Sequence, residues 1–194
     1  MSGWWLASYV VLWVLTVTMF AVLLVVLRQL GLIYVRGGGA PRVEQGPPVG
    51  SIVPEFDGIE DGTGLRYRFP DPERSLNLVL FASPSCRICA DVVTGVPGIA
   101  RDDDVKVFVI SEGSVGSNEA LRAAAAGASF ATDGTRQRIL AVESHPFAIV
   151  ADREGNVLDK GAVNGPGDLQ VLLERAERAQ RDAHASSGAA GDGR

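Results

Sequence analysis

The stretch from residue 76 to residue 93 is LNLVLFASPSCRICADVV, and it holds both cysteines of the 194-residue chain. Its first seven residues form an apolar run bounded by polar residues, which is typical of a buried strand. A helix is predicted to open at Cys86 and to bend or end near Gly95 and Pro97. The stretch therefore predicts a strand that leads through a short turn into a helix with a CxxC pair.

The position of the two cysteines indicates redox chemistry. A helix N-terminus presents unpaired N–H groups and a partial positive charge, which favour a thiolate at Cys86, and the neighbouring Arg87 adds a full positive charge. Cys89 follows one turn later, close enough to close a short disulfide ring and to resolve a mixed disulfide. We therefore expect Cys86 to be the nucleophile.

Two other interpretations of the cysteine pair are half of a zinc site and a pair of inert core thiols. A structural zinc ion takes four ligands, and the remaining candidates are His145 and His184. Because His184 falls in a segment predicted to be a tail, the sequence favours the redox interpretation over zinc.

The segment Ser144-His145-Pro146-Phe147 is the second chemical element, and its proline lies 60 positions after Cys86, directly before an apolar run. An X–Pro bond that enters a strand can be cis, and it then exposes the backbone of the preceding residue for pairing with a substrate strand. We predict that the His145–Pro146 bond is cis and packs against Cys86. His145 would then tune the thiolate or carry a proton; alternatively, it is a surface histidine placed by Pro146.

The remaining pattern predicts an α/β sandwich with parallel strands first and an antiparallel hairpin near the end. No internal repeat is found, and the small polar residues 182–194 predict a disordered tail. Further strands are predicted at 65–69, 105–110, 129–131, 147–150 and 156–158, and further helices at 117–127, 135–142 and 167–181.

The N-terminus is predicted to be a transmembrane anchor over residues 1–36. Residues 4–27 carry no charge, and as a helix they would span about 36 Å, enough to cross a hydrocarbon core of roughly 30 Å. A buried core helix would need a polar face, and this segment has none. Residues 37–48 are rich in Gly and Pro and predict a linker, so the folded domain is expected at 49–181.

The charge balance disfavours a role in nucleic-acid binding. Beyond residue 36 the chain carries 16 basic and 23 acidic side chains, a net charge of −7, and no basic cluster.

Arg28, Arg36 and Arg42 all follow the apolar helix, and the positive-inside rule alone would keep the domain in the cytoplasm.

Taken together, these features resemble the thioredoxin-like fold, a three-layer α/β sandwich. The resemblance is closer to its membrane-anchored TlpA/redoxin branch and, within that branch, to MauD-type methylamine utilization proteins. Three stretches carry it: residues 27–32 (LRQLGL), residues 46–50 (GPPVG) and residues 146–164 (PFAIVADREGNVLDKGAVN). Leu80 is a departure, because thioredoxins often place a buried acid six positions before the first cysteine.

The resemblance implies a thiol-disulfide oxidoreductase that acts on protein thiols or disulfides without a cofactor or metal. The candidate catalytic residues are Cys86, which attacks, Cys89, which resolves, and Pro146 as the cis-proline; Arg87 and His145 are candidate modulating residues. The bilayer would hold residues 4–27, with the domain on the extracytoplasmic side. In MauD-type proteins the suggested role is to help disulfide formation in the small subunit of methylamine dehydrogenase.

Two alternative functions share the same fold. A peroxiredoxin-like peroxidase would use a Thr or Ser three positions before its reactive cysteine, which Ser83 satisfies, although the earlier proline of that motif is replaced by Val79. A copper-delivery protein would bind Cu(I) through Cys86, Cys89 and a histidine, since soft thiolates and imidazole suit that ion.

Overall fold

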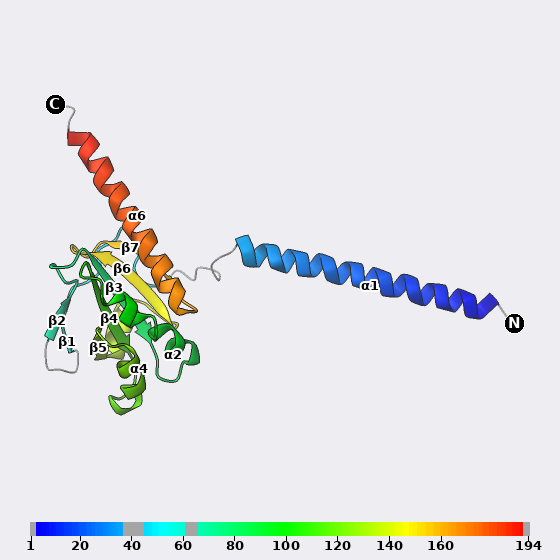
Figure 1. Cartoon of the computed structure of the whole chain (residues 1–194), viewed down its shortest axis with the longest axis horizontal. Coiled ribbons are helices and arrows are strands. Elements are labelled where there is room, and N and C mark those ends of the chain that lie inside the picture. The colour runs from blue at the N-terminus through cyan, green and yellow to red at the C-terminus, as the bar shows by residue number, and fades with distance from the viewer. Residues whose placement is uncertain (1–2, 37–44, 61–65, 192–194) are drawn as a thin grey trace. The chain divides into compact units, whose positions relative to one another are not determined.

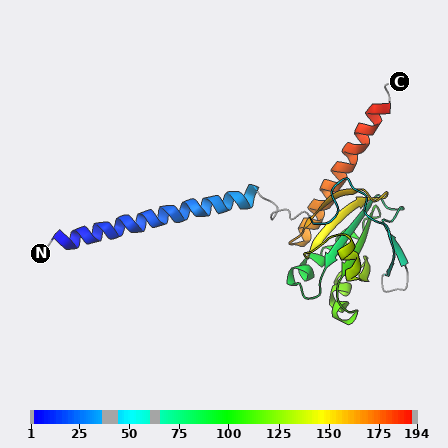
Figure 2. The same ribbon diagram turned by 180° about the vertical axis from the view of Figure 1, so that it is seen from behind.

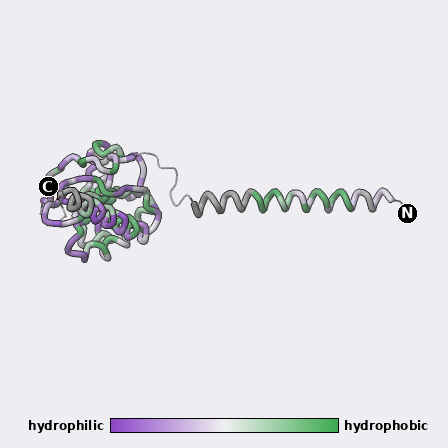
Figure 3. Tube along the Cα trace, turned by 90° about the horizontal axis from the view of Figure 1, so that it is seen from above, coloured by the Kyte–Doolittle hydropathy of each residue, from purple (hydrophilic) through white to green (hydrophobic). Residues whose placement is uncertain are grey.

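The computed structural model describes residues 3–36, 45–60 and 66–191. The chain divides into two compact units, Met1–Pro41 and Arg42–Arg194. The first contains helix α1 (Gly3–Arg36), whose described side chains are exposed. Much of this helix is apolar (Figure 3). One stretch of it, Gly3–Val25, is long and apolar enough to cross a membrane, in keeping with the predicted anchor.

The second unit is built on a five-stranded sheet in the order β5-β4-β3-β6-β7 (Figure 1). Strands β3 (Leu76–Ala82), β4 (Val105–Ser111) and β5 (Ser129–Thr132) are parallel, while β6 (Phe147–Asp152) and β7 (Val157–Ala162) add antiparallel pairs. This arrangement confirms the predicted α/β fold. It also places the end of β3 beside the start of β6, because Phe81 pairs with Phe147.

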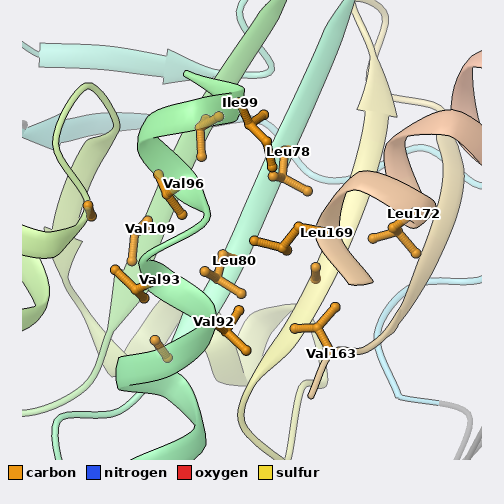
Figure 4. Packing of buried hydrophobic residues seen from close by; sticks show 14 of the residues in the cluster. Leu78, Leu80, Val92, Val93, Val96, Ile99, Val109, Val163, Leu169 and Leu172 are labelled. Carbon is orange, nitrogen blue, oxygen red and sulfur yellow. The ribbon is translucent and has the colours of Figure 1, made fainter. Parts of the chain in front are cut away.

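One face of the sheet is covered by helices α2 (Arg87–Val93), α3 (Val96–Ile99), α4 (Glu119–Ala124) and α6 (Pro166–Gly191). Figure 4 shows the side chains of α2 and α3 meeting those of α6 above β3. The buried Leu78 and Leu80 point into this layer, with Val92 and Leu169 among their neighbours. Because strand residues alternate between faces, Val79 and Phe81 belong to the opposite layer.

The opposite face is covered by the segment around α5 (Gly134–Ile139) and by a separate two-stranded sheet, β1 (Phe56–Glu60) and β2 (Arg66–Phe69). The rings of Phe56 and Phe69 stack at 4.8 Å, and Phe69 meets Phe108 of β4 edge-on at 5.3 Å. The sheet therefore lies between two covering layers, as predicted. A short 3-10 helix, η1 (Gly116–Asn118), precedes α4.

The structure differs from the sequence predictions at three places. Strand β1 was not predicted. Residues 45–48, predicted as linker, belong to the folded unit, because Gln45 is buried against it. Helix α6 continues to Gly191 through most of the predicted tail (Figure 2), because this stretch is rich in alanine, the strongest helix former. Predicted linker residues 37–44 and tail residues 192–194 lie outside the described residues.

Candidate active site

The cysteine pair lies where β3 ends and α2 begins, as predicted. Cys86 is the N-cap of α2, with φ −92° and ψ 110°, and its Sγ accepts a hydrogen bond of 3.1 Å from the backbone N–H of Cys89. A disulfide joins the two residues, whose Cα atoms are 5.2 Å apart. The structure thus shows the oxidised form of a redox pair, with a backbone donor already aimed at the first sulfur.

The two cysteines differ in exposure. Cys89 is 0% exposed and belongs to the core beneath α2, whereas Cys86 is only partly buried. Arg87 and Ile88, the two residues between them, are exposed, so the surface around Cys86 carries one cation and one apolar side chain. An incoming sulfur can therefore reach Cys86 but not Cys89.

The predicted cis bond between His145 and Pro146 is present. The carbonyl oxygen of His145 lies 3.9 Å from Cys86 Sγ, so residues 59 positions apart meet at the site. Pro146 is buried, and its own carbonyl accepts a hydrogen bond of 3.3 Å from the N–H of Val163. The backbone before Pro146 thus faces the sulfur of Cys86.

The imidazole of His145 has a different environment from its carbonyl. Its Nε2 atom is buried and has no hydrogen-bond partner among the described residues. The contact of His145 with Cys86 Sγ is made by the main-chain carbonyl oxygen. The structure therefore brings His145 to the site, as predicted, through its main chain.

The described core offers no carboxylate as an internal proton carrier. Its buried polar residues are amides and hydroxyls, and Leu80, at the position often acidic in thioredoxins, is 0% exposed and packed among aliphatic side chains.

Two further observations concern the alternative functions. The hydroxyl of Ser83 is engaged with that of Ser85, at 2.9 Å between the two oxygens. Across the part of the chain that the structure describes, there is no group of three or more His, Cys, Asp or Glu residues that could hold a metal ion. Neither observation favours a peroxidase or a copper carrier over disulfide exchange.

Gln45 is a residue near the site that sequence reasoning missed. Its buried side chain binds the backbone of Glu143 and Ser144, directly before His145. A glutamine among glycines and prolines looks like part of a linker, and only the GPPVG stretch that follows it gave any signal.

The chain is similar to proteins of known name over nearly its whole length. It is 29% identical to methylamine utilization protein MauD of Methylorubrum extorquens over 175 residues, covering 87% of this chain and 85% of that protein. It is 27% identical to MauD of Paracoccus denitrificans over 190 residues, covering 90% of each. No protein-family profile matches the chain.

Solved structures similar to this one have a thioredoxin-like fold. The thioredoxin domain of a thiol-disulfide oxidoreductase from Bacteroides vulgatus superposes with a TM-score of 0.56 at 18% identity, covering 66% of this chain and 97% of that one. A candidate thiol:disulfide interchange protein DsbE from Chlorobium tepidum gives 0.57 at 19% identity, covering 68% and 97%. With its CxxC pair at the start of α2, the chain has a thioredoxin-like fold and is similar in sequence to MauD proteins.

Proposed function

We propose that this protein is a membrane-anchored enzyme that exchanges disulfides with a partner protein, with Cys86 as the nucleophile and Cys89 as the resolving thiol. The observation that carries the proposal is the asymmetry of the pair. Cys86 is accessible, receives the Cys89 N–H and faces the His145 carbonyl, whereas Cys89 is fully buried.

The proposed exchange proceeds in two steps. The Cys86 thiolate attacks one sulfur of a substrate disulfide, so that a mixed disulfide forms and the other substrate sulfur leaves as a thiolate. The Cys89 thiolate then attacks Cys86 Sγ, which releases the second substrate thiolate and forms the Cys86–Cys89 disulfide. Two electrons pass to the substrate; the reverse sequence oxidises a substrate dithiol.

The neighbouring residues support the first step in different ways. The Cys89 N–H and the start of α2 stabilise negative charge on Cys86 Sγ, and the exposed Arg87 adds a positive charge beside it. Pro146 sets the backbone of His145 against the sulfur, so a substrate segment can pair with that backbone while its own sulfur meets Cys86. We propose that the His145 imidazole modulates the thiolate.

The proposed setting is a membrane surface. Helix α1 supplies an apolar span, and similarity to the MauD proteins favours a substrate that belongs to methylamine utilization. We propose that the domain is extracytoplasmic, although Arg28, Arg36 and Arg42 would indicate a cytoplasmic domain by the positive-inside rule alone.

Disulfide turnover by the full-length chain in detergent tests this proposal. With dithiothreitol as reductant and a synthetic peptide that contains one intramolecular disulfide, the wild-type chain should accelerate reduction above the rate with dithiothreitol alone. The Cys86→Ser chain should give only that background rate. Full activity of Cys86→Ser would refute the assignment of the nucleophile.

A further inference from the structure

Gln45 connects the N-terminal end of the folded unit to the loop that precedes Pro146. The residue is 9% exposed, and its Oε1 accepts hydrogen bonds from the backbone N–H of Glu143 at 2.9 Å and of Ser144 at 2.8 Å. Its Nε2 donates to Ser144 Oγ at 2.7 Å. One buried amide thus satisfies two backbone donors that lie 98 and 99 residues further along the chain.

Lys160 of β7 fixes the backbone of Gln45 from the other side. Its ammonium donates to the carbonyl oxygens of Gln45 at 2.8 Å and Gly46 at 2.9 Å, and the Gly46 N–H donates to Ala141 O at 2.9 Å. Gly46 has a φ of +70°, and a Cβ there would lie 3.2 Å from the Phe147 ring. The glutamine is therefore held at its backbone as well as at its side chain.

The loop is consequently fastened on both sides of His145. Gln45 holds Glu143 and Ser144 on one side, and on the other the carbonyl of Pro146 accepts the Val163 N–H at 3.3 Å. Between these two attachments lies the carbonyl of His145, 3.9 Å from Cys86 Sγ. The position of that carbonyl depends on Gln45, whereas Cys86 Sγ is held independently, by α2 and the Cys89 N–H.

We infer that Gln45, with its backbone fixed by Lys160, is a positioning residue for the substrate segment. It holds the main chain of His145 where an extended peptide can pair with it, without touching the reacting sulfurs. This inference rests on the proposed disulfide exchange. If it holds, turnover of an extended peptide needs the loop, whereas the reaction of Cys86 with a small reagent needs only α2. A general loss of stability would lower both rates together.

The test compares Gln45→Ala, Gln45→Glu and the exposed Gln170→Ala on α6 in the full-length chain in detergent micelles. For the disulfide peptide we expect Gln45→Ala to raise KM about fivefold, the equivalent of roughly one lost hydrogen bond, with little change in kcat. Alkylation of reduced Cys86 by iodoacetamide should keep its wild-type rate. Gln45→Glu should restore KM, because a carboxylate accepts both N–H groups, and Gln170→Ala should match the wild-type chain.

Amide hydrogen exchange gives a second readout that needs no substrate. Glu143 and Ser144 should lose protection in Gln45→Ala and keep it in Gln45→Glu. Unchanged protection in Gln45→Ala, or an equal fall in peptide turnover and alkylation, would overturn the positioning role. If the wild-type chain does not turn over the peptide, the proposed function is overturned instead. The two failures can be told apart, because in that case neither the wild-type chain nor any variant turns over the peptide.

Discussion

Two cysteines three positions apart occupy different environments, and this difference predicts different chemistry for them. Cys86 caps α2 and accepts a backbone hydrogen bond, whereas Cys89 belongs to the core. The sequence allowed this assignment because a CxxC pair directly after a buried strand places the first cysteine at a helix start. It could not show the 3.9 Å approach of the His145 carbonyl, which depends on β6 lying beside β3.

At the scale of single residues, the charge of Arg87 should also raise the reactivity of the Cys86 thiol. Arg87→Ala in the reduced chain should slow alkylation of Cys86 at mildly acidic pH by about two- to fivefold, since a nearby cation stabilises the thiolate. The difference should shrink in high salt, because the guanidinium is exposed. Arg101→Ala, an exposed arginine after α3, serves as the control. An equal effect from both variants would exclude a local charge effect.

The imidazole of His145 can be tested apart from its carbonyl. In His145→Ala the main chain beside Cys86 remains, and only the ring is lost. If the ring favours the thiolate, the variant should alkylate more slowly than the wild-type chain. Alkylation rates across the pH range would show this. An unaltered profile would leave the main-chain carbonyl as the only contribution of His145.

At the scale of elements, the strands and helices of the sheet could be predicted because each is marked by a local pattern. The alternation along β3 is an example, with Leu78 and Leu80 on one face and Val79 and Phe81 on the other. Strand β1 was missed, because it is held by its pairing with β2 and by the stacking of Phe56 on Phe69 rather than by a local pattern. Gln45 was missed for the same reason, since its partners lie 98 and 99 residues away.

The junction between α2 and α6 depends on a glycine. A Cβ at Gly95 would lie 2.7 Å from the Cβ of Pro166, whereas one at Gly98 would meet nothing within 4 Å. Gly95→Ala should therefore lower the free energy of unfolding by about 1–3 kcal/mol, as in overpacked cores. Gly98→Ala should leave it unchanged or raise it by up to about 1 kcal/mol, because alanine favours the helix. Urea unfolding of both variants tests this, and equal midpoints would contradict the close approach.

At the scale of the whole molecule, the chain consists of an apolar helix and a folded unit that are stabilised separately. Within α1 the hydroxyls of Thr16 and Thr18 each donate to a carbonyl four residues earlier, at 2.8 Å. Such internal pairing lets a hydroxyl enter a bilayer without an external partner. The full-length chain should accordingly resist extraction from membranes by alkaline carbonate, and its release would contradict the anchor.

The start of the folded unit can be located by shortening the chain. A chain that begins at Arg42 and one that begins at Val49 should both stay soluble without detergent. The shorter chain should be about 1–3 kcal/mol less stable, because it lacks the hydrogen bonds of Gln45 and Gly46. Urea unfolding measures the difference. Equal stability of the two chains would place the start of the folded domain at Val49, as predicted from the sequence.

The most direct test of disulfide exchange at Cys86 is to trap its intermediate. Cys89→Ser removes the resolving thiol, so the reduced full-length variant, mixed with the disulfide peptide, should accumulate a mixed disulfide at Cys86. Mass spectrometry should find one peptide bound to Cys86, which dithiothreitol releases, and none bound to the Cys86→Ser variant. A peptide bound to Cys89 in Cys86→Ser, or no bound peptide in Cys89→Ser, would contradict the account.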